Sequence, residues 1–460
     1  METFFRSARI IVAITTATWA ACGLASDSQP FAPAHELILL RHATLFDGNQ
    51  NAPRADMDVV VDGERITQVV RDADLEPRVL EKARIVDLRG LFLMPGMIDA
   101  HVHLATPPNR RQAEAVLRRD LYGGVTAVRD MADDLRAVGD LSRASLVGEI
   151  AAPDIFYAAV MAGPAFFTDA RTVQTSAGGA PGEVPWMQAV TDRTNLPLAV
   201  AQARGTFATA IKLYADMGPA LAARITKEAH RQHMKVWAHA TLYPAKPSEV
   251  VAAGVDTISH ACLLVRETMA RVPEWGQPRP PVDVPAFRDG RNASLAPLFL
   301  EMKRRGTILD ATVWTYSADT AGSTTTPPLP PGSCDDAIGG AITGQAYRAG
   351  VLIDAGTDNV ADWTDLWPDL LHELIALSDK AGMPNSAVLR SATLIAARAT
   401  GQERDMGSIE PGKLANMVVL ARDPMVDLNN LKSVVTTIKR GRMFERAAFV
   451  PLEAGDITDR

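Results

Sequence analysis

The chain contains two histidines whose spacing suits a divalent metal ion. His101 and His103 are separated by one residue in the stretch PGMIDAHVHL. If that stretch forms a strand, both side chains point to the same face and can bind one ion together. The same spacing also suits ordinary strand surface, because two histidines this close occur by chance. The rest of the chain therefore decides which interpretation holds.

Four more residues of suitable type follow, each at or just after the end of a short apolar run. Neutral imidazoles and carboxylates are ligands of Zn²⁺, Mn²⁺ and Co²⁺. A bound ion lowers the pKa of its water toward about 7. Asp358, in DAGTDN, can both bind such an ion and take a proton from that water. The full candidate set is His101, His103, Lys212, His239, His260 and Asp358.

Lys212 is the unusual member, since a cationic amine repels metal ions. Its neighbours Ile211 and Leu213 are apolar, which predicts a desolvated strand and a lowered pKa for the amine. A neutral lysine can take up carbon dioxide and become a carbamate. That carbamate is an anionic ligand able to bridge two ions.

Strands and helices that alternate would position these residues. In ALAARITKEAHRQH, Leu221, Ile225 and Ala229 recur at helical spacing, and similar segments separate short apolar runs. Alternation repeated eight times predicts a parallel α/β barrel, in which the carboxyl ends of the strands form the rim where barrel enzymes place their sites. The predicted strands are 97–101, 125–130, 154–159, 210–214, 235–239, 257–260, 308–312 and 351–355.

Three long connections follow predicted strands three, six and seven. They are rich in Pro, Gly or Thr, and they would therefore lie on the rim. Their length favours a role in covering substrate over that of plain surface loops. They are residues 163–185, 262–297 and 315–332.

Both chain ends are rich in β-type sequence. Alternating β-branched residues and Asp-Gly or Arg-Gly turns occur in MDVVVDGERITQVV and again in VVTTIKRGRMFE. This pattern predicts a small β-sandwich domain built from both ends. We expect that domain to comprise residues 35–94 and 403–448, with the barrel spanning 95–402.

The first residues predict export. Arg6 and Arg9 precede an apolar run and then small residues, which is the architecture of a signal peptide over residues 1–25. We expect a periplasmic or secreted protein. In an alternative reading, the residues before Cys22 form a lipoprotein box and Cys22 carries a lipid anchor. If the leader is removed, Cys262 and Cys334 remain, and a single bridge between them is possible but not established by the sequence.

Composition excludes one class of partner. The net charge of −7 offers no electrostatic basis for binding nucleic acid. At 460 residues the chain is too long for a single small core, which agrees with a large barrel and an appended domain.

The motifs together resemble the amidohydrolase superfamily of metal-dependent hydrolases. They are PGMIDAHVHL, IKLYADM, VWAHA, ISHA, AGTDN and GSIEPGKLANMVVL, and the resemblance covers roughly residues 37–448. It is strongest to the imidazolonepropionase-like branch that includes Xaa-Pro dipeptidase-like enzymes. It implies a distorted (β/α)₈ TIM barrel with a β-sandwich, two divalent ions, and a homo-oligomer. Zn²⁺ is the first expectation for the ions, with Mn²⁺ or Co²⁺ as alternatives.

The resemblance also implies a role for each candidate. The first ion would be bound by His101, His103 and Asp358, the second by His239 and His260, and carboxylated Lys212 would bridge them, with Asp358 as the acid–base. Mononuclear deaminases usually lack this lysine and place Glu three residues after the histidine of strand five. Here that position is Leu242, which favours a binuclear hydrolase.

The implied activity is hydrolysis of a carbon–nitrogen bond by metal-activated hydroxide. The expected substrate is a dipeptide, an N-acyl amino acid or an aryl amide, because relatives in this branch cleave dipeptides and some cleave aryl amides. A lactonase or ester hydrolase using the same site is the first alternative. A catalytically degenerate binding protein is the second.

Three rim aromatics are candidates for substrate contact. Tyr214 lies two residues after Lys212 and should share its face, while Trp314 and Trp363 follow strands seven and eight. Each could instead anchor a loop or pack in the barrel. His230 and His233, on the helix before strand five, are expected to be solvated.

Overall fold

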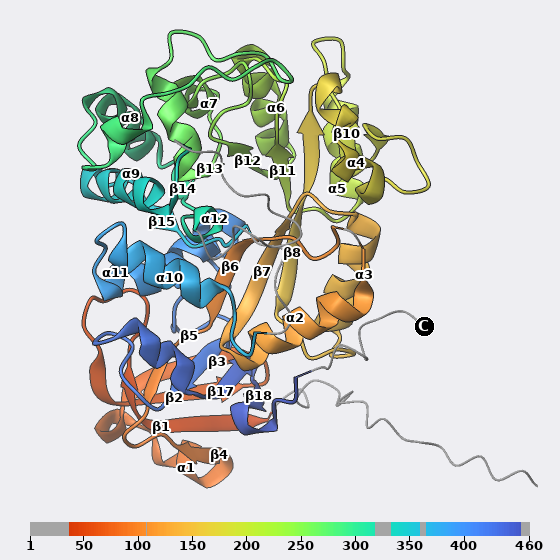
Figure 1. Cartoon of the computed structure of the whole chain (residues 1–460). Helices are drawn as coiled ribbons and strands as arrows, with labels where there is room; N and C mark the ends of the chain where they lie inside the picture. The colour runs from red at the N-terminus through yellow and green to blue at the C-terminus, as the bar shows by residue number, and fades with distance from the viewer. Residues whose placement is uncertain (1–35, 107, 318–332, 359–364, 452–460) are drawn as a thin grey trace, which may run out of the picture.

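The computed structural model describes residues 36–106, 108–317, 333–358 and 365–451. The predicted signal peptide and Cys22 lie outside the described residues. The described chain forms a barrel of strands and helices above a smaller β domain in the view of Figure 1. Among these residues, no helix combines the length and the hydropathy that crossing a bilayer requires.

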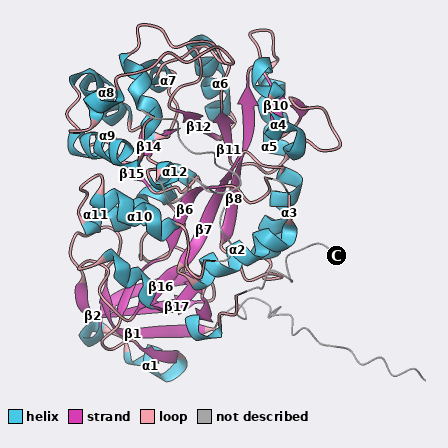
Figure 2. Ribbon diagram, in the orientation of Figure 1, coloured by secondary structure: helices cyan, strands magenta, loops and turns pink. Residues whose placement is uncertain are grey.

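The barrel contains the eight parallel strands that the sequence predicts. Figure 2 shows barrel strands in magenta, with helices in cyan packed around them. Neighbours along the sheet follow chain order, and Ala100 N donates to Ala355 O at 3.0 Å, which nearly closes the ring between the last and first strands. The predicted and observed ends differ by a few residues. The strands are β6 (Met97–Val102), β7 (Val125–Met131), β8 (Asp154–Ala162), β11 (Ala210–Leu213), β12 (Lys235–His239), β13 (Thr257–Ser259), β14 (Ile308–Asp310) and β15 (Ile353–Asp354).

Helices pack around these strands by burying one face each. In α6, Leu221, Ile225 and Ala229 are buried, as their helical spacing predicts. A short hairpin, β9 (Glu183–Val184) and β10 (Met187–Ala189), extends the sheet beside β8. The helices around the barrel are α2 (Arg110–Tyr122), α3 (Leu135–Leu146), α4 (Ala170–Thr175), α5 (Leu196–Gly205), α6 (Pro219–Arg231), α7 (Pro247–Ala252), α8 (Ala296–Arg305), α9 (Asp336–Ala349), α10 (Leu370–Asp379), α11 (Asn385–Arg390) and α12 (Ala396–Thr400).

The β domain is built from both chain ends, as predicted, but its eight strands form one connected mixed sheet. The ends meet where β5 pairs antiparallel with β16, and β5 leads directly into barrel strand β6. One face of β1 and β2 packs against α1 (Pro77–Lys82). The strands are β1 (Leu37–Leu45), β2 (Arg54–Asp62), β3 (Arg65–Arg71), β4 (Arg84–Asp87), β5 (Phe92–Pro95), β16 (Met417–Leu420), β17 (Val434–Lys439) and β18 (Arg442–Glu445).

This sheet folds back on itself, so that its two ends face each other as the two sheets of the predicted sandwich would. Gly63, in the β2–β3 turn, touches Gly441, in the β17–β18 turn: a Cβ placed on Gly441 would lie 2.1 Å from Gly63 O. Both glycines have positive φ, so the turns need residues without a side chain. The two wings enclose one apolar core that includes Leu40, Val59 and Val419.

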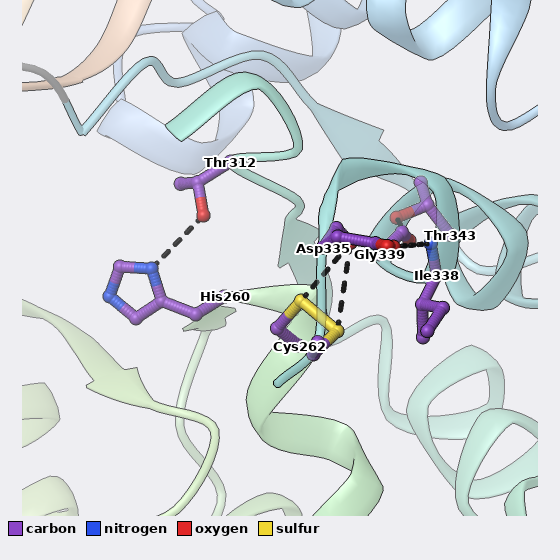
Figure 3. Close-up of a disulfide and its surroundings, with 8 residues drawn as sticks. His260, Cys262, Thr312, Asp335, Ile338, Gly339 and Thr343 are labelled. Carbon is purple, nitrogen blue, oxygen red and sulfur yellow. Dashed lines mark hydrogen bonds between the residues drawn. A yellow bond between two sulfur atoms is a disulfide. The ribbon is translucent and has the colours of Figure 1, made fainter. Parts of the chain in front are cut away.

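A disulfide joins Cys262 to Cys334, with a Cα–Cα distance of 5.6 Å (Figure 3). Cys262 lies in the 3-10 helix Ala261–Thr268, which begins directly after His260. Cys334 immediately precedes Asp335, the N-cap of α9. The bridge therefore ties the connection after β13 to the start of α9.

Replacing both cysteines by serine is expected to lower the free energy of unfolding by about 2–4 kcal/mol. The bridge spans 72 residues of sequence, so its loss frees a long loop in the unfolded chain. Equilibrium unfolding in urea without reductant measures the change. The wild-type protein unfolded with reductant is the control and should match the double variant. Equal midpoints for the oxidised wild-type protein and the variant would contradict this prediction.

Candidate metal centre

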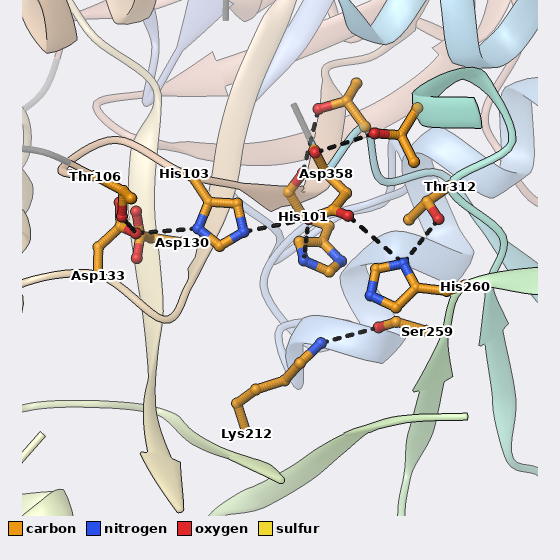
Figure 4. A network of polar contacts seen from close by, with 12 residues as sticks. His101, His103, Thr106, Asp130, Asp133, Lys212, Ser259, His260, Thr312 and Asp358 are labelled. Carbon is orange, nitrogen blue, oxygen red and sulfur yellow. Dashed lines mark hydrogen bonds and ion pairs between the residues drawn. The ribbon is translucent and has the colours of Figure 1, made fainter. Parts of the chain in front are cut away.

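The carboxyl ends of the barrel strands bring the six candidate residues to one rim. Figure 4 labels all of them except His239. His101 lies in β6 and His103 directly after it, Lys212 in β11, and His239 at the end of β12. His260 and Asp358 follow β13 and β15. The His101 ring centre is 5.6 Å from that of His103 and 5.4 Å from that of His260, and His239 and His260 are 4.6 Å apart.

His101, His103 and Asp358 form one half of the site. The Nε2 atoms of the two histidines lie 3.0 and 3.2 Å from Asp358 Oδ1. Ligand atoms of His101, His260 and Asp358 all lie within 4.8 Å of one another. Separations of this size are those of atoms that share one ion, since metal–nitrogen and metal–oxygen bonds are about 2.0–2.2 Å long.

Two carboxylates hold the other nitrogens of these histidines. Asp310 Oδ2 lies 2.6 Å from His101 Nδ1, and Asp133 Oδ1 lies 3.0 Å from His103 Nδ1. Both carboxylates are fully buried. A carboxylate that accepts from Nδ1–H leaves the lone pair on Nε2, which is how metal-binding histidines are commonly oriented. Both histidines therefore present Nε2 to the same point.

The sequence reasoning missed Asp310 and Asp133. Asp310 is the last residue of β14, and Asp133 follows β7 by two residues. A signal was available, because each acidic residue follows a short apolar run, as the candidate ligands do. Their histidine partners are 209 and 30 residues away in the chain, so only the sheet order identifies which histidine each one meets.

Replacing Asp310 by Asn is expected to weaken metal binding about 10–100-fold, the usual effect of losing a carboxylate behind a ligand histidine. The amide keeps the shape but lacks the charge that fixes the His101 tautomer. Titration of the metal-free protein with Zn²⁺ measures the affinity. Asp379→Asn, an exposed residue at the end of α10, is the matched control. An unchanged Zn²⁺ affinity in Asp310→Asn would refute this role.

His239 and His260 form the other half. Burial, followed by Lys212 and His260, holds the pKa of His239 well below its usual value. Burial also lowers the pKa of His260, to about 3, although Asp358 opposes the shift. Both imidazoles are therefore neutral and have lone pairs available to an ion. His260 Nδ1 lies 3.0 Å from Thr312 Oγ1 and 3.6 Å from Asp358 Oδ2.

Lys212 is fully buried on β11, the strand next to β12, which carries His239. Burial lowers the pKa of its amine to about 8, although Asp310, Asp358 and Asp354 act in the opposite direction. Its Nζ is 3.2 Å from Ser259 Oγ. A neutral amine is thus accessible near neutral pH, as the carbamate requires.

The backbone is strained at three residues of the site. His260, Thr312 and Asp358 have φ values of 77°, 46° and 49°, which non-glycine residues seldom adopt. The close approach of β15 to β6 is made possible by Gly356: a Cβ there would lie 2.6 Å from His101 Cβ. Strained residues cluster at functional sites because the surrounding structure holds them in place.

The three rim aromatics differ in their surroundings. The Tyr214 ring stacks on Phe166 at 4.3 Å and lies 4.0 Å from the His239 ring, so it stands beside the metal-binding rim. The Trp314 ring stacks on the His372 ring at 4.9 Å, and the backbone N–H of Trp314 donates to Glu373. These contacts favour the interpretation that Trp314 anchors its loop. Trp363 lies outside the described residues.

Two hollows at the opposite end of the barrel are lined by charged residues that have a structural role. The hollows, of about 290 and 610 Å³, share His230, Lys235 and Asp256 among their lining residues. Asp256 lies within 2.8 Å of His230 Nε2 and 3.0 Å of Lys235 Nζ. Helices end at this face, where cations complement the helix dipole. His230 and His233 are exposed, as predicted.

Comparisons with known proteins agree with this architecture. A model of the amidohydrolase family matches residues 341–444. A dihydroorotase of Streptococcus pyogenes serotype M3 is 25% identical over 107 residues, which are 23% of this chain and 24% of that protein. The chain thus aligns with about a quarter of the length of the curated relatives it matches.

Solved structures cover far more of the chain. The structure of a Xaa-Pro dipeptidase with methionine in its active site is 22% identical with a TM-score of 0.67, covering 89% of this chain and all of that one (100%). A putative prolidase from Bifidobacterium longum is 25% identical with a TM-score of 0.63, covering 92% and 98% of the two chains. These proteins share the barrel and the attached β domain.

Proposed function

We propose that this chain is a member of the amidohydrolase superfamily and a metal-dependent hydrolase acting on carbon–nitrogen bonds, which the family match over residues 341–444 and the similar solved structures support. One observation carries the proposal. The Nε2 atoms of His101 and His103 converge on Asp358 Oδ1 at 3.0 and 3.2 Å, while buried carboxylates occupy both Nδ1 positions. This arrangement suits an ion that is bound by protein ligands and keeps a coordination position open for water or substrate.

The donor set fits two divalent ions, with Zn²⁺ first and Mn²⁺ or Co²⁺ as alternatives. His101, His103 and Asp358 would hold the first ion, and His239 and His260 the second. Lys212, as a carbamate, would bridge them. When bound, the ions would lower the pKa of a water toward about 7 and polarise a carbonyl group.

Asp358 is placed to move the proton of the reaction. Burial acts to raise its pKa, but the contacts of Asp358 with His101 and His103 act in the opposite direction, and the pKa lies well below its usual value. The ionised carboxylate can therefore take a proton from the attacking water. It can then deliver that proton to the leaving nitrogen as the carbon–nitrogen bond breaks.

The substrate we propose is a small amide or peptide: a dipeptide, an N-acyl amino acid or an aryl amide. The solved structures of similar fold include a Xaa-Pro dipeptidase and a putative prolidase, which supports a dipeptide. The partly exposed ring of Tyr214, which stacks on the buried Phe166, offers an aromatic surface beside His239. Such a surface suits an apolar or aromatic substituent on the substrate.

A substrate panel tests this function. The metal-loaded mature protein is incubated with dipeptides, N-acyl amino acids, aryl amides, dihydroorotate and lactones, with and without prior chelation. We expect amide cleavage that chelation abolishes and that Zn²⁺, Mn²⁺ or Co²⁺ restores. Lactone opening without amide cleavage would instead favour an ester hydrolase. Binding of a panel compound without any turnover, in a protein that takes up no metal, would favour a degenerate binding protein.

We also propose that the protein is exported. The Cys262–Cys334 disulfide supports this, because disulfides persist in oxidising compartments. Cell fractionation and N-terminal sequencing of the mature chain test the proposal, with cleavage after Ala25 expected. Incorporation of labelled fatty acid at Cys22 would identify a lipoprotein instead. An uncleaved chain in the cytoplasm would contradict export.

A further inference from the structure

We propose that Ser259 and Trp237 position Lys212 and stabilise its carboxylated form through hydrogen bonds. The inference rests on the carbamate in the proposed function and names the residues that position it. Lys212 Nζ lies 3.2 Å from Ser259 Oγ, and Trp237 Nε1 lies 2.7 Å from the same oxygen (Figure 4 shows Lys212 and Ser259). Ser259 and Lys212 are fully buried, and Trp237 is 1% exposed.

The directions of these hydrogen bonds leave one donor unused. An indole N–H can only donate, so Ser259 Oγ accepts from Trp237, and it also accepts from the Lys212 amine. Among the hydrogen bonds of the described residues, no oxygen accepts the Ser259 hydroxyl hydrogen, and the lone pair of a neutral Lys212 amine, which could accept it, is consumed by carboxylation. A buried donor without a partner is costly. A carbamate on Lys212 supplies the missing acceptor, since its two oxygens carry negative charge.

Trp237 is held rigidly, so its N–H stays directed at Ser259. The guanidinium of Arg129 lies 5.2 Å from the centre of the Trp237 ring, and Arg129 is itself tied to Thr400 O by a 2.7 Å hydrogen bond. In the sheet register, Trp237 pairs with Lys212 on one side and Thr257 on the other. The indole is therefore a fixed neighbour of the lysine across adjacent strands.

Carboxylation joins the Lys212 amine to carbon dioxide and releases one proton. The lone pair of neutral Lys212 Nζ forms a bond to the carbon of dissolved carbon dioxide. One carbon–oxygen π pair moves onto oxygen, and the nitrogen releases one proton to the buffer. The product anion can then accept the Ser259 hydrogen. Because this step is reversible, any group that binds the anion raises its occupancy at a given bicarbonate concentration.

Ser259→Ala is expected to raise the bicarbonate concentration needed for half-occupancy by about 10–100-fold, the range for losing a hydrogen bond to a charged group. The protein is equilibrated with ¹³C-bicarbonate, and the carbamate carbon is followed by NMR beside metal content. Trp237→Phe keeps the ring but loses the N–H, and should shift the curve in the same direction. Ser259→Thr keeps the hydroxyl and should restore occupancy.

Thr257→Val is the matched control. Thr257 lies two residues from Ser259 on β13 and is buried, but its hydroxyl makes no hydrogen bond among the described residues. This variant should follow the wild-type bicarbonate curve. A wild-type curve in Ser259→Ala, with a clear carbamate signal, would overturn this inference alone. Absence of a carbamate signal in the wild-type protein at every bicarbonate concentration would overturn the carboxylated lysine in the proposed function as well.

Discussion

Asp358→Asn is expected to lower kcat by about 10²–10⁴-fold, the usual contribution of a general acid–base. The amide keeps an oxygen near His101 and His103 but cannot take the proton of the attacking water. It therefore cannot supply one to the leaving nitrogen. Steady-state kinetics on the best substrate of the panel, at saturating metal, measure the loss.

Two controls separate this effect from loss of metal. Metal content of Asp358→Asn should stay above one ion per chain, since five other ligands remain. Asp379→Asn, at an exposed position at the end of α10, should retain wild-type kcat. Full turnover in metal-loaded Asp358→Asn would show that another group moves the proton.

Lys212→Met is expected to lower kcat by about 10³-fold, because polarisation by an ion contributes several kcal/mol and each 1.36 kcal/mol is a tenfold change. Methionine fits the apolar surroundings of the strand but cannot become a bridging anion. We expect bound metal to fall from two ions per chain to one. Elemental analysis of the dialysed protein measures this fall, and kinetics measure the rate.

Lys235→Met is the matched control for the lysine. It makes the same substitution on the adjacent strand β12, but at the opposite end of the barrel, where Lys235 pairs with Asp256 at 3.0 Å. Metal content and kcat should both stay near wild-type values. Two tightly bound ions in Lys212→Met would exclude the lysine as a bridging ligand.

The order of the barrel strands was predictable from the sequence because short apolar runs alternate with helix-like segments, although the predicted and observed strand ends differ by a few residues. KVWAH predicts β12, and its last residue, His239, ends the observed strand. The helix α6 was predictable from the spacing of Leu221 and Ile225, because a helix that buries one face has apolar residues at helical intervals. These features depend on short stretches of chain.

Other features depend on contacts that a single sequence does not record. Asp310 meets His101 across 209 residues because β14 and β6 end at the same rim. Trp314 packs on His372 of α10, although the two residues are far apart in the chain. The curved sheet of the β domain depends on the contact between Gly63 and Gly441. In the sequence, each glycine indicates only an ordinary turn.

The rim formed by the six candidate residues is expected to bind the ions on which catalysis depends. The most direct measurement is the metal content and amide hydrolysis of one wild-type preparation, stripped with chelator and titrated back with Zn²⁺ in bicarbonate buffer. We expect uptake of two ions per chain, with the rate of amide hydrolysis rising in proportion to the metal bound. Full amide hydrolysis by the stripped protein, or no uptake of Zn²⁺, would contradict it.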